Sequence, residues 1–93
     1  MISADAAETL GIKALAWVIG DEELLPVFMG ASGVSADDLR ANAGDPQFLG
    51  SVLEFILMDD AWVIRFAEEA AIKPELVMQA RMALPGGEQV HWT

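Results

Sequence analysis

Acidic side chains are the residues of this chain that could most readily do chemistry, because they stand in adjacent groups. The groups are Asp21-Glu22-Glu23, Asp37-Asp38, Asp59-Asp60 and Glu68-Glu69. All but the last stand where a helix is expected to begin, and there a carboxylate caps the helix and offsets its dipole. A helical metal site needs carboxylates one turn apart, often with a histidine, and no calcium-loop spacing occurs. We therefore predict neither a metal ion nor a cofactor.

Nucleophilic catalysis lacks its usual residues. The chain has no cysteine and no tyrosine, and none of its serines lies in a Gly-x-Ser-x-Gly elbow. The only histidine is His91, so it would have to serve any Ser–His pair. The stretch "GASG" at 30–33 precedes a helix but lacks the lysine and the preceding strand of a phosphate-binding loop. No catalytic residue can be named, and we expect a protein that is not an enzyme.

The C-terminal stretch "LPGGEQVHWT" places the histidine and a tryptophan after a pair of glycines. In one interpretation Gly86 and Gly87 form a joint, and His91 and Trp92 contact a partner, since tryptophan is enriched among interface hot spots. In the other, the tail folds back and Trp92 covers a groove of its own domain, burying on the order of 200 Å². A pH-sensing or metal-binding role for His91 would lack the partner ligands that it needs.

These residues must be positioned by helices, and the sequence signals at helix ends predict the first two of them. Ser3 can cap a helix that stops at Gly20, and Trp17 belongs to its apolar face. Asp21 begins a second helix. Pro26 lies inside that stretch, which predicts a kink or a late start, because proline cannot donate a backbone hydrogen bond.

The later helices carry stronger start signals. Ser35 and Asp38 have the spacing of a capping box, with Asp in place of the usual Glu. Asp45 can cap a fourth helix with Pro46 in its first position. This helix is apolar nearly all round, so we expect it in the middle of the fold. The stretches "DDAWVIRFAEEA" and "KPELVMQARMAL" predict a fifth and a sixth helix, the last ending at Pro85-Gly86.

The two halves of the chain resemble each other. With a shift of 38 residues, Leu10 falls on Phe48 and Asp21 on Asp59, and apolar positions keep meeting apolar positions without a gap. One interpretation is a duplicated three-helix unit. The other is that two amphipathic helical stretches of similar length align this well by chance.

The net charge of −10 limits the classes of partner. Nucleic acids and anionic membranes are bound through Lys and Arg, and the five such residues here are never adjacent. The longest nearly apolar stretches, 10–19 and 48–58, are shorter than the roughly 20 residues of a membrane-spanning helix. The start of the chain also lacks the features of a signal peptide. We expect a cytoplasmic protein without membrane contact, and nucleic acid binding is unfavourable.

A helix-turn-helix is the main alternative, suggested by the second and third helices with Gly33 in the turn. In a DNA reader the first residues of the second helix meet bases and phosphates. Here these are Ala36, Asp37 and Asp38, and carboxylates at that place would repel phosphate. Two alternatives follow: a helix-turn-helix-like nucleic-acid-associated protein, and an acidic DNA mimic that occupies the groove of a DNA-binding protein.

Several stretches resemble a known family. They are "GVSADDLR", "DPQFLGSVLEFIL", "FAEEAAIKPELVMQAR" and "ALPGG" followed by "HW", and together they cover nearly the whole chain. The chain is similar to short, mostly alphaproteobacterial proteins that share a domain of unknown function. The resemblance implies a bacterial cytoplasmic origin and supplies no catalytic or binding residues. Ala71 stands where the family pattern has Gly, which predicts a tighter turn or a continuing helix there.

Together these observations predict an all-α, compact bundle of five to six short helices. We expect a single helical domain over 1–84 and a C-terminal tail over 85–93. The expected function is that of a non-enzymatic protein-interaction or regulatory module with an unidentified, basic protein partner. His91, Trp92 and exposed carboxylates are the predicted contact set. A homo-oligomer is left open.

Overall fold

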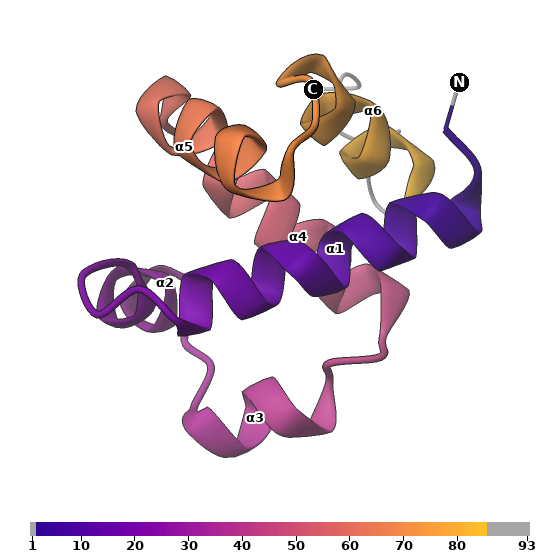
Figure 1. The fold of residues 1–93 in the computed structure, drawn as a ribbon. Coiled ribbons are helices and arrows are strands. Elements are labelled where there is room, and N and C mark those ends of the chain that lie inside the picture. The colour runs from indigo at the N-terminus through magenta and orange to yellow at the C-terminus, as the bar shows by residue number, and fades with distance from the viewer. Residues whose placement is uncertain (1, 86–93) are drawn as a thin grey trace, which may run out of the picture.

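The computed structural model describes residues 2–85, and this part of the chain forms helices without any strand (Figure 1). The helices are α1 (Ala4–Ile19), α2 (Leu24–Ser32), α3 (Ala36–Ala41), α4 (Pro46–Leu57), α5 (Asp60–Ala70) and α6 (Glu75–Ala83). The predicted all-α bundle is therefore confirmed. Within the described range, no helix has the length and apolar character needed to span a membrane.

The predicted helix starts are present with their caps. The Ser3 hydroxyl accepts a hydrogen bond from the backbone N–H of Ala6 at 3.1 Å. Ser35 and Asp38 form the reciprocal capping box at the start of α3. The Asp45 carboxylate caps α4, with proline in the first position of the helix as expected. These local signals fix where the helices begin, since each satisfies backbone N–H groups that the helix leaves unpaired.

Helix α2 begins late, as Pro26 predicted. The helix starts at Leu24, so the proline lies in its first turn, where a missing N–H costs no helical hydrogen bond. Asp21 stands before the helix, and its Oδ1 accepts hydrogen bonds from the backbone N–H groups of Glu23 at 2.9 Å and Leu24 at 3.1 Å. The side chain thus holds the turn that joins α1 to α2.

Helix α4 occupies the middle of the bundle, as its apolar sequence predicted. It packs against α1, α5 and α6, and half of its residues are buried. Figure 1 shows α1 crossing in front of it. The two helices approach closely where Gly11 of α1 meets Leu49 of α4, since a Cβ on Gly11 would lie only 2.8 Å from the Leu49 Cβ. Glycine at this position therefore sets the distance between the two central helices.

Aromatic rings connect α2 and α5 to α4. The Phe28 ring of α2 lies edge-on to that of Phe55, with ring centroids 5.1 Å apart. Trp62 of α5 packs on the same Phe55 ring, with ring centroids 4.8 Å apart. Phe28 is 1 % exposed and is, of the two buried side chains of α2, the one that belongs to the core cluster; the other is Leu24. Aromatic contacts of this kind add to the energy of burial.

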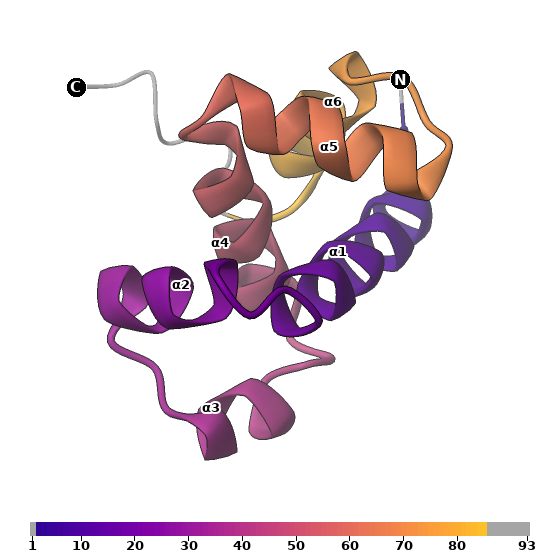
Figure 2. The ribbon, with the colours of Figure 1, turned by 60° about the vertical axis from the view of Figure 1, so that its left-hand side comes forward.

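The two halves match in helix order but not in packing. Helices α1 and α2 lie against each other, and so do their counterparts α4 and α5. The third helices differ, since α6 packs on both α1 and α4, whereas α3 makes only sparse contacts and buries Leu39 alone. Both ribbon views show α3 set apart below α1 and α2 (Figure 1, Figure 2). Two equivalent units around α4 are therefore not formed.

The turn between α5 and α6 differs from the prediction. The helix does not continue through Ala71, since α5 ends at Ala70. Ala71 adopts φ 58° and ψ 45°, the left-handed conformation in which glycine is usual. The backbone N–H of Ile72 donates to the carbonyl of Ala67 at 2.9 Å, which closes the helix end as in a Schellman motif. The chain therefore keeps the glycine-type turn without the glycine.

The end of α6 is fixed to α4 by Arg81. Its guanidinium donates to Glu54 Oε1 at 2.8 and 3.2 Å and to the backbone carbonyl of Pro85 at 3.3 Å. Leu84 beside it is 2 % exposed. We call this arrangement of Glu54, Arg81 and Pro85 the α6 latch. The latch holds the last described residues, and the predicted tail contacts His91 and Trp92 lie outside the described residues.

Candidate functional site

Most of the acidic groups act as helix caps or lie in solvent. Asp38, Asp45 and Asp59 accept hydrogen bonds from backbone N–H groups at helix starts, and Glu68 is exposed on α5. Among residues 2–85, no three acidic or histidine side chains come close enough together to hold a metal ion. The carboxylates that share a surface feature are instead those near the α1–α2 turn.

An open hollow of about 970 Å³ lies between α1, the α1–α2 turn and α5. Its apolar side is formed by Trp17 and Phe66, whose ring centroids are 5.6 Å apart at an angle of 52°. Trp17 is half-buried, while Phe66 is 1 % exposed and belongs to the core. The tryptophan therefore forms both part of the core boundary and the accessible floor of this hollow, which we call the acidic hollow.

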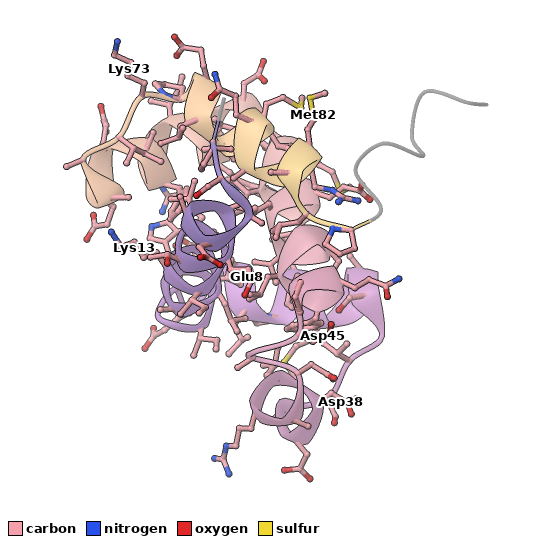
Figure 3. The ribbon with its side chains drawn as sticks, turned by 90° about the vertical axis from the view of Figure 1, so that its right-hand side faces the viewer. Glu8, Lys13, Asp38, Asp45, Lys73 and Met82 are labelled. Atoms are coloured by element: carbon pink, nitrogen blue, oxygen red, sulfur yellow. The ribbon has the colours of Figure 1, made fainter. Side chains whose placement is uncertain are left out.

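Charged side chains surround this floor. Four carboxylates line the hollow, against one lysine; they are Asp21, Glu22, Glu23 and Glu69. The lysine is Lys13, which extends outward from α1 on the side of α5 (Figure 3). Glu22, Glu23 and Glu69 are exposed. The acidic hollow therefore presents an excess of negative charge around an aromatic surface, which suits a cationic group with apolar parts.

The ends of two helices increase this negative character. Gly20, which ends α1, and Ala70, the last residue of α5, both line the hollow. Neither helix carries a basic residue in its last turn. The C-terminal end of a helix has a partial negative charge that favours nearby cations. Two such ends without a cation of their own therefore add to the attraction for a basic group.

Asp21 is held rigidly at the edge of the acidic hollow. Its Oδ1 caps α2, and its Oδ2 lies 3.0 Å from Nη2 of Arg65 on α5. The hydrogen bonds from the backbone N–H groups of Leu24 and Glu23, followed by the positive charge of Arg65, lower the pKa of this carboxyl below its usual value. The side chain is only 17 % exposed, so the charged carboxylate has a fixed position.

Arg65 also contacts Trp17, the residue that forms the floor of the hollow. Its guanidinium carbon lies 5.7 Å from the centroid of the Trp17 ring, the geometry of a cation–π contact. The side chain itself is 54 % exposed. It does not line the hollow but lies where Trp17 and Asp21 meet. We call this place, formed by Trp17 and Asp21, the arginine corner.

Sequence patterns did not identify Lys13, Trp17 or Arg65 as parts of a surface site. Trp17 was assigned to the apolar face of its helix, which is correct for only one side of the ring. Arg65 and Asp21 are 44 residues apart in the chain, and no spacing rule joins them. The acidic group at the start of α2 was the available signal, and it was interpreted as a cap alone.

The helix-turn-helix alternative finds the expected connection but an unsuitable surface. Gly33 takes a left-handed φ of 75° between α2 and α3, as a tight turn requires. The first turn of α3 exposes Asp37 and Asp38. α3 is also only loosely joined to the remaining helices. A duplex would therefore meet carboxylates on a poorly supported helix.

Comparison with protein families gives a match over most of the chain. Residues 4–87 match the family described as "Protein of unknown function (DUF3572)". No curated protein and no solved structure matches the chain. The match covers all six described helices and continues past the α6 latch to the glycine pair. The chain therefore belongs to the DUF3572 family of proteins of unknown function.

Proposed function

We propose that this protein is a non-enzymatic interaction module that binds a basic segment of another protein through the acidic hollow. The observation that carries the proposal is the combination of an accessible aromatic floor, Trp17, with four surrounding carboxylates. A protein with a net charge of −10 attracts basic partners from a distance, and complementary charge raises the rate of encounter. The aromatic floor would then supply contact energy at short range.

The remaining parts of the proposal concern regions that lie partly or wholly outside the described residues. We place the folding unit at 1–84 and a tail at 85–93, in the cytosol of a bacterium. His91 and Trp92 form a second, independent contact in this proposal, since tryptophan is frequent at the centre of interfaces. The α6 latch supports such an arrangement, because it fixes where the tail leaves the bundle.

The test is affinity capture with the full chain and with a variant in which the acidic hollow is neutralised. The variant combines Glu22→Gln, Glu23→Gln and Glu69→Gln, all at exposed positions. We expect the wild-type chain to retain a basic protein at low salt and to release it at high salt, because screening weakens contacts between exposed charges. The neutralised variant should retain much less of the same protein.

The matched control removes three charges elsewhere. It combines Asp5→Asn, Asp37→Asn and Glu75→Gln, which are exposed in the first turns of α1, α3 and α6. Equal losses in both triple variants would mean that net charge alone acts, and would contradict a role of the hollow. Retention of duplex DNA by the free protein at low salt would favour the nucleic-acid alternative instead.

A further inference from the structure

The arginine corner already holds a guanidinium, that of Arg65. Two contacts place it there: the face of Trp17 at 5.7 Å and the Asp21 carboxylate at 3.0 Å. A planar cation stacked on an aromatic ring and paired with a carboxylate is how proteins commonly bind an arginine of a partner. The structure thus shows directly which chemical group fits at the edge of the acidic hollow.

Arg65 is held weakly enough to be replaced. Its side chain is 54 % exposed, so its ion pair is formed in water and screened by salt. Asp21, by contrast, is fixed by hydrogen bonds from two backbone N–H groups to Oδ1, and these are independent of Arg65. The receptor side of the pair would therefore keep its geometry if Arg65 moved away, and its Oδ2 would be open to another donor.

We propose that the arginine corner is a binding subsite for an arginine side chain of the basic partner, and that Arg65 fills it in the free protein as an internal competitor. This proposal rests on the proposed function, since it concerns the same hollow. The incoming arginine would repeat the contacts with Trp17 and Asp21. The flanking residues of the partner would then lie along the hollow, beside the carboxylates of Glu23 and Glu69.

Two properties follow from this arrangement. The site should prefer arginine to lysine, because an ammonium group lacks the planar surface that stacks on the Trp17 ring. Removal of Arg65 should raise the affinity for an arginine-containing partner, since binding would no longer require the internal contacts to break.

The experiment measures binding of a labelled short peptide of alternating arginine and alanine by fluorescence anisotropy at low salt. The corresponding lysine peptide is the reference ligand. The variant Arg65→Gln should bind the arginine peptide about fivefold more tightly than the wild type, the change expected when an exposed pair no longer competes. Arg40→Gln is the matched control, because it removes one positive charge from α3, which lines no part of the hollow. It should change the affinity far less.

Trp17→Leu provides a second, independent variant. It keeps an apolar side chain but removes the aromatic face, so the preference for the arginine peptide over the lysine peptide should disappear. Equal gains for Arg65→Gln and Arg40→Gln, or an unchanged arginine preference in Trp17→Leu, would overturn the proposed subsite while binding of basic partners would stand. Absence of binding of either peptide to every variant at low salt would contradict the proposed function itself, and the subsite with it.

Discussion

The two ion pairs among the described residues differ in which partner is the less exposed. In the α6 latch the arginine, Arg81, is 11 % exposed and its partner Glu54 is 53 % exposed. In the arginine corner the order is reversed, with Arg65 54 % exposed and Asp21 17 % exposed. The latch therefore fixes a guanidinium and leaves a carboxylate in solvent, whereas the corner fixes a carboxylate and leaves a guanidinium in solvent.

The difference shows that two similar Arg–carboxylate ion pairs can have different roles. Arg81 bonds both a side chain and the backbone carbonyl of Pro85, so its removal would leave a backbone group without its partner. Arg65 donates only to Oδ2 of Asp21, whose Oδ1 is held by other hydrogen bonds. The packed side of the molecule, α1 with α4 and α6, thus uses its arginine for stability. The open corner between α1, α2 and α5 presents a fixed anion that another cation can use.

Gly11→Ala should cause the largest loss, on the packed side. The new Cβ would lie 2.8 Å from the Leu49 Cβ, so α1 and α4 would have to separate, at a cost of about 1–3 kcal/mol. Each kcal/mol should lower the thermal midpoint by roughly 4–8 °C. Gly30→Ala is the control, because it meets nothing within 4 Å and should gain about 0.5–1 kcal/mol from helix propensity. A midpoint raised by both substitutions would contradict the close contact of α1 and α4.

The comparison of the two arginines can be tested by the same substitution at both. Arg81→Gln should lower the free energy of unfolding by about 1–2 kcal/mol, because a charged donor to three hydrogen bonds, only 11 % exposed, is lost. Arg65→Gln should cost less than about 1 kcal/mol, as an exposed pair does. Urea denaturation measures both. Equal losses of unfolding free energy in the two variants would contradict the proposed difference between the two ion pairs.

Ala71→Gly should stabilise the helix that carries Arg65. Ala71 has a left-handed φ of 58°, which costs alanine about 1–2 kcal/mol and glycine almost nothing. After the greater entropy loss of glycine is subtracted, a net gain of about 0.5–1 kcal/mol remains. The same change at the exposed helical position Ala61 should destabilise instead, so opposite shifts of the thermal midpoint are expected. Two shifts in the same direction would count against the left-handed turn.

Asp21 should give the smallest effect, a dependence of stability on pH that is confined to the acid range. Its pKa is lowered, chiefly by the hydrogen bonds from the backbone N–H groups of Leu24 and Glu23 and then by the charge of Arg65. The unfolded chain therefore takes up this proton at a higher pH than the folded chain. The resulting stabilisation is present above about pH 4 and is lost as the pH falls through the lowered pKa. In Asp21→Asn this loss is absent, so the wild-type midpoint should fall more steeply on acidification. Parallel curves of thermal midpoint against pH for the wild type and Asp21→Asn would contradict the lowered pKa of Asp21.

Local sequence signals predicted the helix starts and the central helix. Ser3, the Ser35–Asp38 box and Asp45 with Pro46 act within one helical turn, so their effect does not depend on the rest of the fold. The largely apolar character of α4 likewise requires burial of most of its surface, and only its polar residues Gln47, Ser51 and Glu54 are exposed.

The site could not be predicted in the same way. The Arg65–Asp21 contact depends on how α5 crosses the end of α1, and crossing angles follow from packing rather than from a local pattern. The differing positions of α3 and α6 have the same origin, since both halves predict the same three helices. The left-handed conformation of Ala71 could not be predicted, because it is usual for glycine and the sequence has alanine at this position.

The most direct test of the acidic hollow follows the indole N–H resonances of the three tryptophans by NMR while the arginine–alanine peptide is added. Trp17 lines the hollow, whereas Trp62 lies against Phe55 and does not. A saturating shift of the Trp17 resonance, with that of Trp62 unchanged, is the result that the account predicts. Binding that leaves Trp17 unchanged, or that shifts Trp92 alone and so places the contact on the tail, would contradict it.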